Sequence, residues 1–385
     1  RTGMIAILKR EWKSYFQNIT GWLFIAAVLA LYGLYFLAYN LRAGYPYVSY
    51  TLSAISFIML IAVPILTMRS MAEERHSRTD QLVLTAPVSL GKMIFGKFLA
   101  MVGVFTLAVA VIAVTPLVLA AFGTVPMGEN YVAVLGFWLY GCTCIAVGML
   151  ASALTESQVI AAVVAFAFLF LGYMMNSITG LIGDHLITKV LGAYDLYTPL
   201  QSFMSGCLDL TGVVYFVSVT GLCLFLTCQC VQKRRWSMTT KKLTTGMFSV
   251  AMIVVGFAVA VAVNLVVKEM PSSWTVVDAT STKLYSLTDT TKDYVKNLSQ
   301  DVTIYVLSSE KSADSTLAET LQRYEDLSKH LKVVYKDPAK SPNFYQQYTD
   351  SAPSQNSMIV VSDARSRVVD YSDIYEYSYD YSTYS

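Results

Sequence analysis

The sequence predicts a polytopic α-helical membrane protein with six core spans, a seventh span and a C-terminal extracytoplasmic α/β domain. The first observation is a set of seven apolar stretches without Asp, Glu, Lys or Arg: 21–40, 52–68, 98–122, 132–153, 159–175, 213–231 and 248–267. Each is close to the roughly 17–25 residues that a helix rising about 1.5 Å per residue needs to cross a bilayer core. The second is composition, because only 14% of residues are charged, against roughly 25% in soluble domains.

The placement of basic residues predicts the orientation of the spans. The segments 1–20, 69–97 and 231–247 hold 14 Lys and Arg, whereas the loops of the opposite side hold only Arg42 and Lys189. Because short cytoplasmic loops are enriched in Lys and Arg, we expect a cytoplasmic N-terminus. The seventh span then leads the remaining residues out of the cytoplasm.

Residues 1–20 are predicted to form an amphipathic helix at the inner interface. Apolar residues recur there at three- and four-residue spacing, while Lys9, Arg10 and Lys13 lie on the other side and Trp12 serves with them as an interfacial anchor. A frayed leader is the alternative. The core is assigned to 21–231 and a basic cytoplasmic linker to 232–247, where the cations set topology rather than bind nucleic acid.

The longest cytoplasmic loop, 69–97, carries a dense cluster of charges. Its candidate residues are Glu73, Glu74, Arg75, Arg78, Thr79 and Asp80. A charge cluster in a loop is usually only a solvated face, but its position makes it the main candidate docking surface. The inner turn that contains Thr155 and Glu156 lies on the same predicted side.

Several features within the membrane half have structural interpretations. Residues 179–210 are predicted to form short helices that do not span, Pro116 and Gly172 to allow bending, and Asn264 to form an interhelical hydrogen bond. All six cysteines lie in this half and are interpreted as small apolar packing residues.

The region 268–385 is acidic, with 17 Asp and Glu against 12 Lys and Arg, and contains no cysteine. Its patterns predict an α/β layer with a C-terminal end that is incomplete. The expected helices are 289–298 and 315–330, and the expected strands are 302–307, 331–336, 357–361 and 367–371.

The chain lacks the residues that an autonomous pump or enzyme requires. Ion-coupled carriers place acidic or basic side chains within the membrane, and the seven apolar stretches contain none. Gly91-Lys92 and Gly96-Lys97 are followed by Met93 and Phe98, and not by the Ser or Thr that a phosphate-binding loop requires. The sequence therefore predicts a permease or anchor that binds no cofactor itself and takes its energy from a partner.

The run 71–89, followed by Gly96-Lys97-Phe98, resembles the cytoplasmic loop of ABC-2 class permeases: an acidic pair precedes a Thr, a Leu-rich turn and a Thr-x-Pro. The stretch 151–158 is similar to the inner turn of that family between its fourth and fifth spans. The resemblance implies a six-span ABC-2 permease with elbow and coupling helices that contact a separate ATPase. That subunit, in two copies, would bind the ATP and Mg.

The exterior region resembles the domain of gliding-motility-type ABC auxiliary proteins. The similar segments are 278–288, 302–305, 334–338 and 358–361. The resemblance implies a permease fused to an auxiliary domain that contacts an envelope partner.

These expectations describe the permease subunit of an exporter in the bacterial plasma membrane. Six core spans are too few to enclose a path, so a second permease copy, in a homodimer, is expected around a two-fold axis. Two alternatives stay open. One is a mechanical or sensory protein that moves no cargo, and the other is a passive membrane-anchored binding module.

Overall fold

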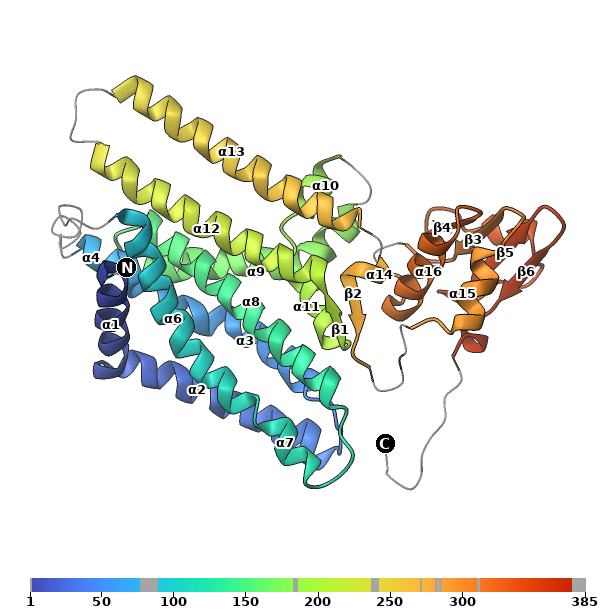
Figure 1. Ribbon diagram of the computed structural model, residues 1–385, viewed down its shortest axis with the longest axis horizontal. Helices are drawn as coiled ribbons and strands as arrows, with labels where there is room; N and C mark the ends of the chain where they lie inside the picture. Colours follow the sequence, from blue (N-terminus) through green and yellow to red (C-terminus); the bar gives the residue numbers. More distant parts are fainter. Residues whose placement is uncertain are drawn as a thin grey trace. The chain divides into compact units, whose positions relative to one another are not determined.

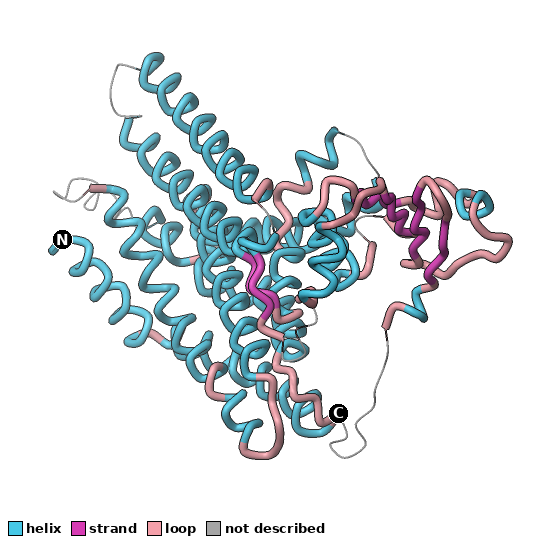
Figure 2. The backbone as a smooth tube through the Cα atoms, turned by 45° about the vertical axis from the view of Figure 1, so that its right-hand side comes forward, coloured by secondary structure: helices cyan, strands magenta, loops and turns pink. Residues whose placement is uncertain are grey.

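Apolar helices dominate the computed structural model, which describes residues 2–76, 89–182, 186–236, 242–270, 272–280, 283, 286–309 and 312–375. The chain divides into two units, Arg1–Glu269 and Met270–Ser385. The first unit is almost entirely helical, whereas the second contains the strands β3 to β6 (Figures 1 and 2).

The first unit contains long helices joined by short ones and by a single short strand. Its elements are α1 (Thr2–Gln17), α2 (Ile19–Phe36), π-helix η1 (Leu37–Arg42), α3 (Ser49–Thr67), α4 (Arg69–His76), α6 (Leu90–Ile112), α7 (Thr115–Ala120), α8 (Met127–Leu154), α9 (Gln158–Ile182), α10 (Leu186–Leu191), α11 (Tyr197–Met204), β1 (Cys207–Asp209), α12 (Leu210–Trp236) and α13 (Lys242–Lys268).

Seven helical segments in the described residues are long and apolar enough to cross a membrane, one for each predicted span. The segments are Ile19–Arg42, Ser49–Glu74, Leu90–Ala120, Met127–Leu154, Gln158–Ile182, Leu210–Gln232 and Ser249–Lys268. The predicted polytopic helical fold is therefore confirmed.

Helix α8 lies at the centre of the first unit, where it packs against α3, α6, α9 and α12. In its most apolar window 78% of residues are buried, whereas in the last span the figure is 0%. Phe137 and Tyr140 of α8 are fully buried. Small residues allow neighbouring side chains to approach this helix closely, because a Cβ on Gly148 would lie 2.3 Å from Thr67 Oγ1.

Helix α13 packs on α12, and polar contacts fix its position there. Asn264 Nδ2 donates to Ser218 Oγ at 2.7 Å, and Ser249 Oγ donates to Gln229 Oε1 at 3.1 Å. The predicted interhelical hydrogen bond of Asn264 is confirmed. Apolar surface alone does not select one register between two helices in lipid, and paired polar groups do.

Several predicted boundaries differ from the structure. The predicted linker 232–247 lies between the spanning segments Leu210–Gln232 and Ser249–Lys268. Helix α12 continues into it to Trp236 and α13 begins within it at Lys242, because Lys and Arg are good helix formers. Helix α6 begins at Leu90 rather than near residue 98 and therefore includes Lys97. Lysine is a good helix former, so Lys97 does not interrupt the helix, and its buried ammonium group is paired.

The two predicted bending points have different outcomes. Near Pro116 the helix is interrupted: α6 ends at Ile112, and α7 starts at Thr115. Pro116 lies in the first turn of α7, where a proline is tolerated. By contrast, α9 runs through Gly172 without interruption. The missing side chain admits Leu196, because a Cβ on Gly172 would lie 2.8 Å from Leu196 Cδ1. Residues 186–204 form the short helices α10 and α11, as predicted.

The second unit is an α/β layer. Its elements are α14 (Ser272–Thr275), β2 (Val276–Asp278), α15 (Asp289–Lys296), β3 (Val302–Val306), α16 (Ser315–Leu327), β4 (Leu331–Tyr335), the 3-10 helices η2 (Phe344–Gln347) and η3 (Tyr371–Asp373), β5 (Met358–Ser362) and β6 (Ser366–Val369). Four strands form a sheet in the order β4-β3-β5-β6. The two helices and four strands predicted from sequence all form, with ends that differ by a few residues.

Strand pairing in this sheet follows the hydrophobic pattern. Strand β3 pairs parallel with β4 and antiparallel with β5, which places Ile304 beside Val333 and Val360. These residues belong to the same apolar cluster as Leu317 and Leu321 of α16. The α16 helix thus connects two parallel neighbours and covers the sheet, as in a βαβ unit.

Two carboxylates cap helices of this unit and bind neighbouring segments. Asp314 caps α16 by accepting from Leu317 N at 2.8 Å, and Tyr375 Oη donates to the same carboxylate at 2.6 Å. Asp370 accepts from the backbone N–H and the hydroxyl of Ser354, and from Ser372 N. These hydrogen bonds, those from Ser354 first, hold the pKa of Asp370 well below its ordinary value of 3.8.

Candidate functional site

The amphipathic helix α1 packs along α6 (Figure 1), and its residues Ile7, Trp12 and Phe16 are half-buried. Two glycines of α6 make the close approach possible. A Cβ on Gly96 would lie 3.3 Å from Ile7 Cγ2, and a Cβ on Gly103 would lie only 2.1 Å from Trp12 Cζ3. Trp12 is therefore held against α6, a packing role beyond that of the predicted anchor. The predicted elbow cations Lys9, Arg10 and Lys13 are exposed.

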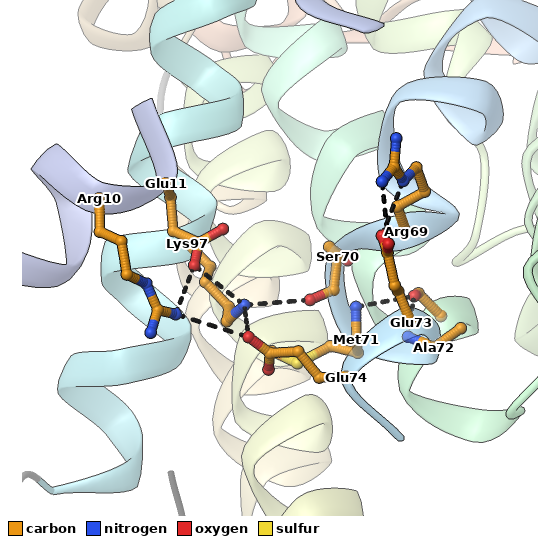
Figure 3. A network of polar contacts seen from close by, with 10 residues as sticks. Arg10, Glu11, Arg69, Ser70, Met71, Ala72, Glu73, Glu74 and Lys97 are labelled. Carbon is orange, nitrogen blue, oxygen red and sulfur yellow. Dashed lines mark hydrogen bonds and ion pairs between the residues drawn. The ribbon is translucent and has the colours of Figure 1, made fainter. Parts of the chain in front are cut away.

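Lys97 of α6 is a buried cation between α1 and α4, with its side chain only 3% exposed. Its Nζ donates to Glu11 Oε1 at 3.3 Å, to Glu74 Oε1 at 2.7 Å and to the Ser70 carbonyl at 3.2 Å (Figure 3). An ammonium group has three N–H donors, and here each has an acceptor. Two of the acceptors are charged, as a buried ion requires.

Arg10 completes this ionic cluster from the solvent side. Its Nη2 lies 2.6 Å from Glu11 Oε1 and 3.5 Å from Glu74 Oε1, so it bridges the two carboxylates that Lys97 also contacts. The hydrogen bond to Glu11 raises the pKa of Arg10. Among the described residues, these contacts pair the buried Lys97 and the exposed Arg10 with the same two carboxylates.

Helix α4 carries a second ion pair on its other side (Figure 3). Arg69 and Glu73 form two parallel hydrogen bonds of 2.7 and 2.9 Å, the bidentate geometry that makes guanidinium–carboxylate pairs specific. Arg69 Nη1 also donates to Thr20 Oγ1 of α2 at 3.3 Å. Helix α4 is thus tied to α2 as well as to α6.

The start of α4 is capped by a side chain from α8. Ser152 Oγ accepts from Met71 N at 3.1 Å and from Ala72 N at 3.0 Å, and it donates to the Met68 carbonyl at 3.1 Å. The first N–H groups of a helix lack partners within the helix, so this buried hydroxyl supplies one. Nearby, the buried Ser70 Oγ has no hydrogen-bond partner among the described residues.

The structure brings together only part of the predicted coupling site. Glu73 and Glu74 lie on α4 and face Arg69 and Lys97 respectively. Arg75 also lies on α4, whereas the predicted Arg78, Thr79 and Asp80 fall outside the described residues.

The inner turn lies between α8 and α9, both of which pack against α4. There Ser157 N donates to Thr155 Oγ1 at 3.2 Å, and Glu156 is exposed.

Sequence reasoning missed Glu11, Lys97 and Ser152, which the structure places at the centre of this region. Only Lys97 gave a signal, as the last cation before a long apolar stretch. The six cysteines are free thiols. Within the residues that the structure describes, no group of three or more His, Cys, Asp or Glu side chains could hold a metal ion.

Comparison with known families assigns the membrane region. Residues 44–231 match a family described as ABC-2 family transporter protein. This region is an ABC-2 transporter membrane domain. Residues 281–374 match a domain of unknown function, DUF7088. Comparison with curated proteins gave no match.

The ABC-2 domain begins after α2 and ends within α12, so α3, α4, α6 and α8 all belong to it. The match supports a permease subunit of an ABC transporter, a membrane component without its own ATPase site. Helix α1 precedes the matched region and is joined to it through the cluster of Arg10, Glu11, Glu74 and Lys97, hereafter the Lys97 cluster.

Proposed function

We propose that this chain is the transmembrane subunit of a bacterial ABC exporter and that separate ATP-binding subunits drive it. The observation that carries this proposal is α4 within the ABC-2 domain. A short charged helix directly follows an apolar span and is anchored to α6 by Lys97, to α8 by Ser152 and to α2 by Arg69. Force applied to α4 would therefore reach several spans at once.

The distribution of charged residues in the membrane half supports an external energy source. Ion-coupled carriers need acidic or basic groups that bind a transported ion within the membrane. The seven apolar stretches contain no such group, and the buried Lys97 already has three acceptors. An ATPase partner, which would bind the ATP and Mg, supplies the energy instead.

The working complex would contain two permease copies and two ATPase subunits. Two copies related by a two-fold axis would enclose a path that six core spans cannot enclose alone. Nucleotide-driven approach of the two ATPases would move α4 and shift the spans between two states. Because the spans are apolar, a hydrophobic or lipid-like cargo fits them best, and the C-terminal domain would act outside the cell, on the cargo or on an envelope partner.

Orientation and the ATPase contact can be tested with two matched cysteine variants. His76 is exposed at the end of α4, and Thr124 is exposed just before α8. Ser152, near the other end of α8, contacts α4, and α8 has 28 residues, so the two sites are separated by most of a helix about 40 Å long. A membrane-impermeant maleimide applied to intact cells should label T124C and not H76C, above the background of the unsubstituted chain.

A bifunctional crosslinker applied to inverted vesicles should join H76C, and not T124C, to the co-expressed ATP-binding subunit. The reverse labelling pattern would contradict the proposed orientation. Crosslinking of both variants or of neither would contradict α4 as the contact.

Transport can be measured after reconstitution of the chain and this ATPase in vesicles. A fluorescent phospholipid and a hydrophobic dye are suitable probes for the expected class of cargo. ATP-dependent movement of either probe would support the exporter, and an ATPase-dead partner should abolish it. ATP hydrolysis that moves neither probe but changes the protease sensitivity of the C-terminal domain would contradict the exporter and favour a mechanical role.

A further inference from the structure

Lys97 joins three helices that are far apart in the sequence. Glu11 lies 86 residues from it, and Glu74 and Ser70 lie 23 and 27 residues away. Glu11 belongs to α1, while Ser70 and Glu74 are one turn apart on α4. A single ammonium group on α6 therefore contacts both α1 and α4.

We infer that Lys97 is a positioning residue that couples the movement of α4 to α1 and α6. The inference rests on the proposed function, because it assigns a role to Lys97 in the transfer of motion from the ATPase. The compact ammonium can satisfy both carboxylates and the Ser70 carbonyl only when α1 and α4 occupy this one arrangement on α6. A displacement of α4 must either carry α1 and α6 with it or leave a buried charge without its partner.

A purely stabilising role explains these contacts less well. Burying ions costs free energy that their attraction often fails to recover, so a buried ion pair is weak evidence of stability, and its best-attested role is to specify one arrangement. The apolar contacts of Trp12 and Ile7 with α6 would hold α1 without any ion. What the Lys97 cluster adds is a connection from α1 to α4.

Three variants separate positioning from charge balance. K97M removes the cation that both carboxylates contact and keeps the carboxylates, so it is expected to assemble poorly. The double variant K97M/E74Q removes one cation and one anion, so the pair of Arg10 and Glu11 stays balanced while the link to α4 is lost. K92M is the matched control, because Lys92 lies on the same helix and is exposed.

The first measurement is hydrogen exchange of residues 2–17 in the permease alone, in lipid nanodiscs. It does not depend on the ATPase, and any direct contact of Glu74 with that subunit cannot affect it. K97M/E74Q should raise exchange in α1 by about tenfold, as expected for loss of a tertiary anchor. K92M should leave it unchanged within about twofold.

The second measurement is ATP hydrolysis by the complex relative to the free ATPase subunit. With the permease in excess, so that weaker binding through Glu74 does not limit the reaction, K97M/E74Q should lose most of the stimulation by the permease, whereas K92M should retain it. Unchanged exchange of α1 in the double variant, or wild-type stimulation despite faster exchange, would overturn the role of Lys97. A wild-type chain that neither binds nor stimulates the ATPase would instead refute the proposed function.

Discussion

Ser152 offers the sharpest test of how the first unit holds α4. The substitution S152A removes one hydroxyl that is fully buried and makes three hydrogen bonds to the backbone at residues 68, 71 and 72. Loss of a serine cap costs about 0.5–2 kcal/mol, and a buried N–H left without an acceptor costs about 1–3 kcal/mol. Because Met71 and Ala72 are buried, we expect about 2 kcal/mol, the upper end of the cap range.

The neighbouring Ser70 provides the control. Its hydroxyl is also buried but lacks a hydrogen-bond partner among the described residues, so S70A removes a polar group that gains nothing from folding. S70A should be neutral or slightly stabilising, because no hydrogen bond is lost and a desolvated hydroxyl is removed. The two variants make the same chemical change at nearby sites and differ only in hydrogen bonding.

Hydrogen exchange of a peptide that covers residues 69–76, measured in nanodiscs, reports the local opening of α4. A cost of about 2 kcal/mol corresponds to roughly 30-fold faster exchange if the loss is confined to this helix. S70A should stay within about twofold of the wild type. Equal exchange in S152A and S70A would refute the capping role of Ser152, and faster exchange in S70A would show that the Ser70 hydroxyl has a hydrogen-bond partner.

Three further predictions concern packing, helix register and acid stability. G103A should destabilise the protein by about 1–3 kcal/mol, because the new methyl group overlaps the Trp12 ring; W12L should relieve part of this loss in a double-mutant cycle of thermal unfolding. N264L should weaken the packing of α13 on α12 by about 0.6 kcal/mol through loss of the bond to Ser218. Faster hydrogen exchange in α13 would reveal this loss, and unchanged exchange would contradict it. D370N should lower the unfolding temperature at pH 7, and its difference from the wild type should shrink below the ordinary Asp pKa of 3.8. The sign follows because a lowered pKa stabilises the fold above the unfolded value and loses this effect as pH falls; a pH-independent difference would contradict it.

The fold class could be predicted because the apolar stretches of the first unit and the residue spacing in the second unit are both local properties of the sequence. A bilayer span depends on the length and apolarity of one continuous stretch, and all seven stretches coincide with helical segments in the structure. The helices and strands of the second unit follow from the spacing of residues such as Leu317 and Leu321 along the chain. Asn264 was predicted correctly for the same reason, since a polar side chain within an apolar span needs a partner.

The candidate site was predicted only in part. The charged segment 69–80 was recognised from its composition, but no local pattern pairs Glu74 with a lysine 23 residues later or with Arg10. The start of α6 was predicted too late, because Lys97 ends the uncharged stretch but not the helix, which begins at Leu90. The pairing of Lys97 with Glu11 and Glu74 allows its ammonium group to be buried.

The sequence alone determined where the chain is apolar enough to enter a membrane, where it is not, and which segments form helices or strands, because neighbouring residues decide these properties. Only the tertiary structure decided that α1 covers α6, that Ser152 caps α4 and that Lys97 connects α1 with α4. These contacts join residues up to 86 positions apart. Their partners are set by helix packing and by the requirement that each buried charge or N–H has a counterpart.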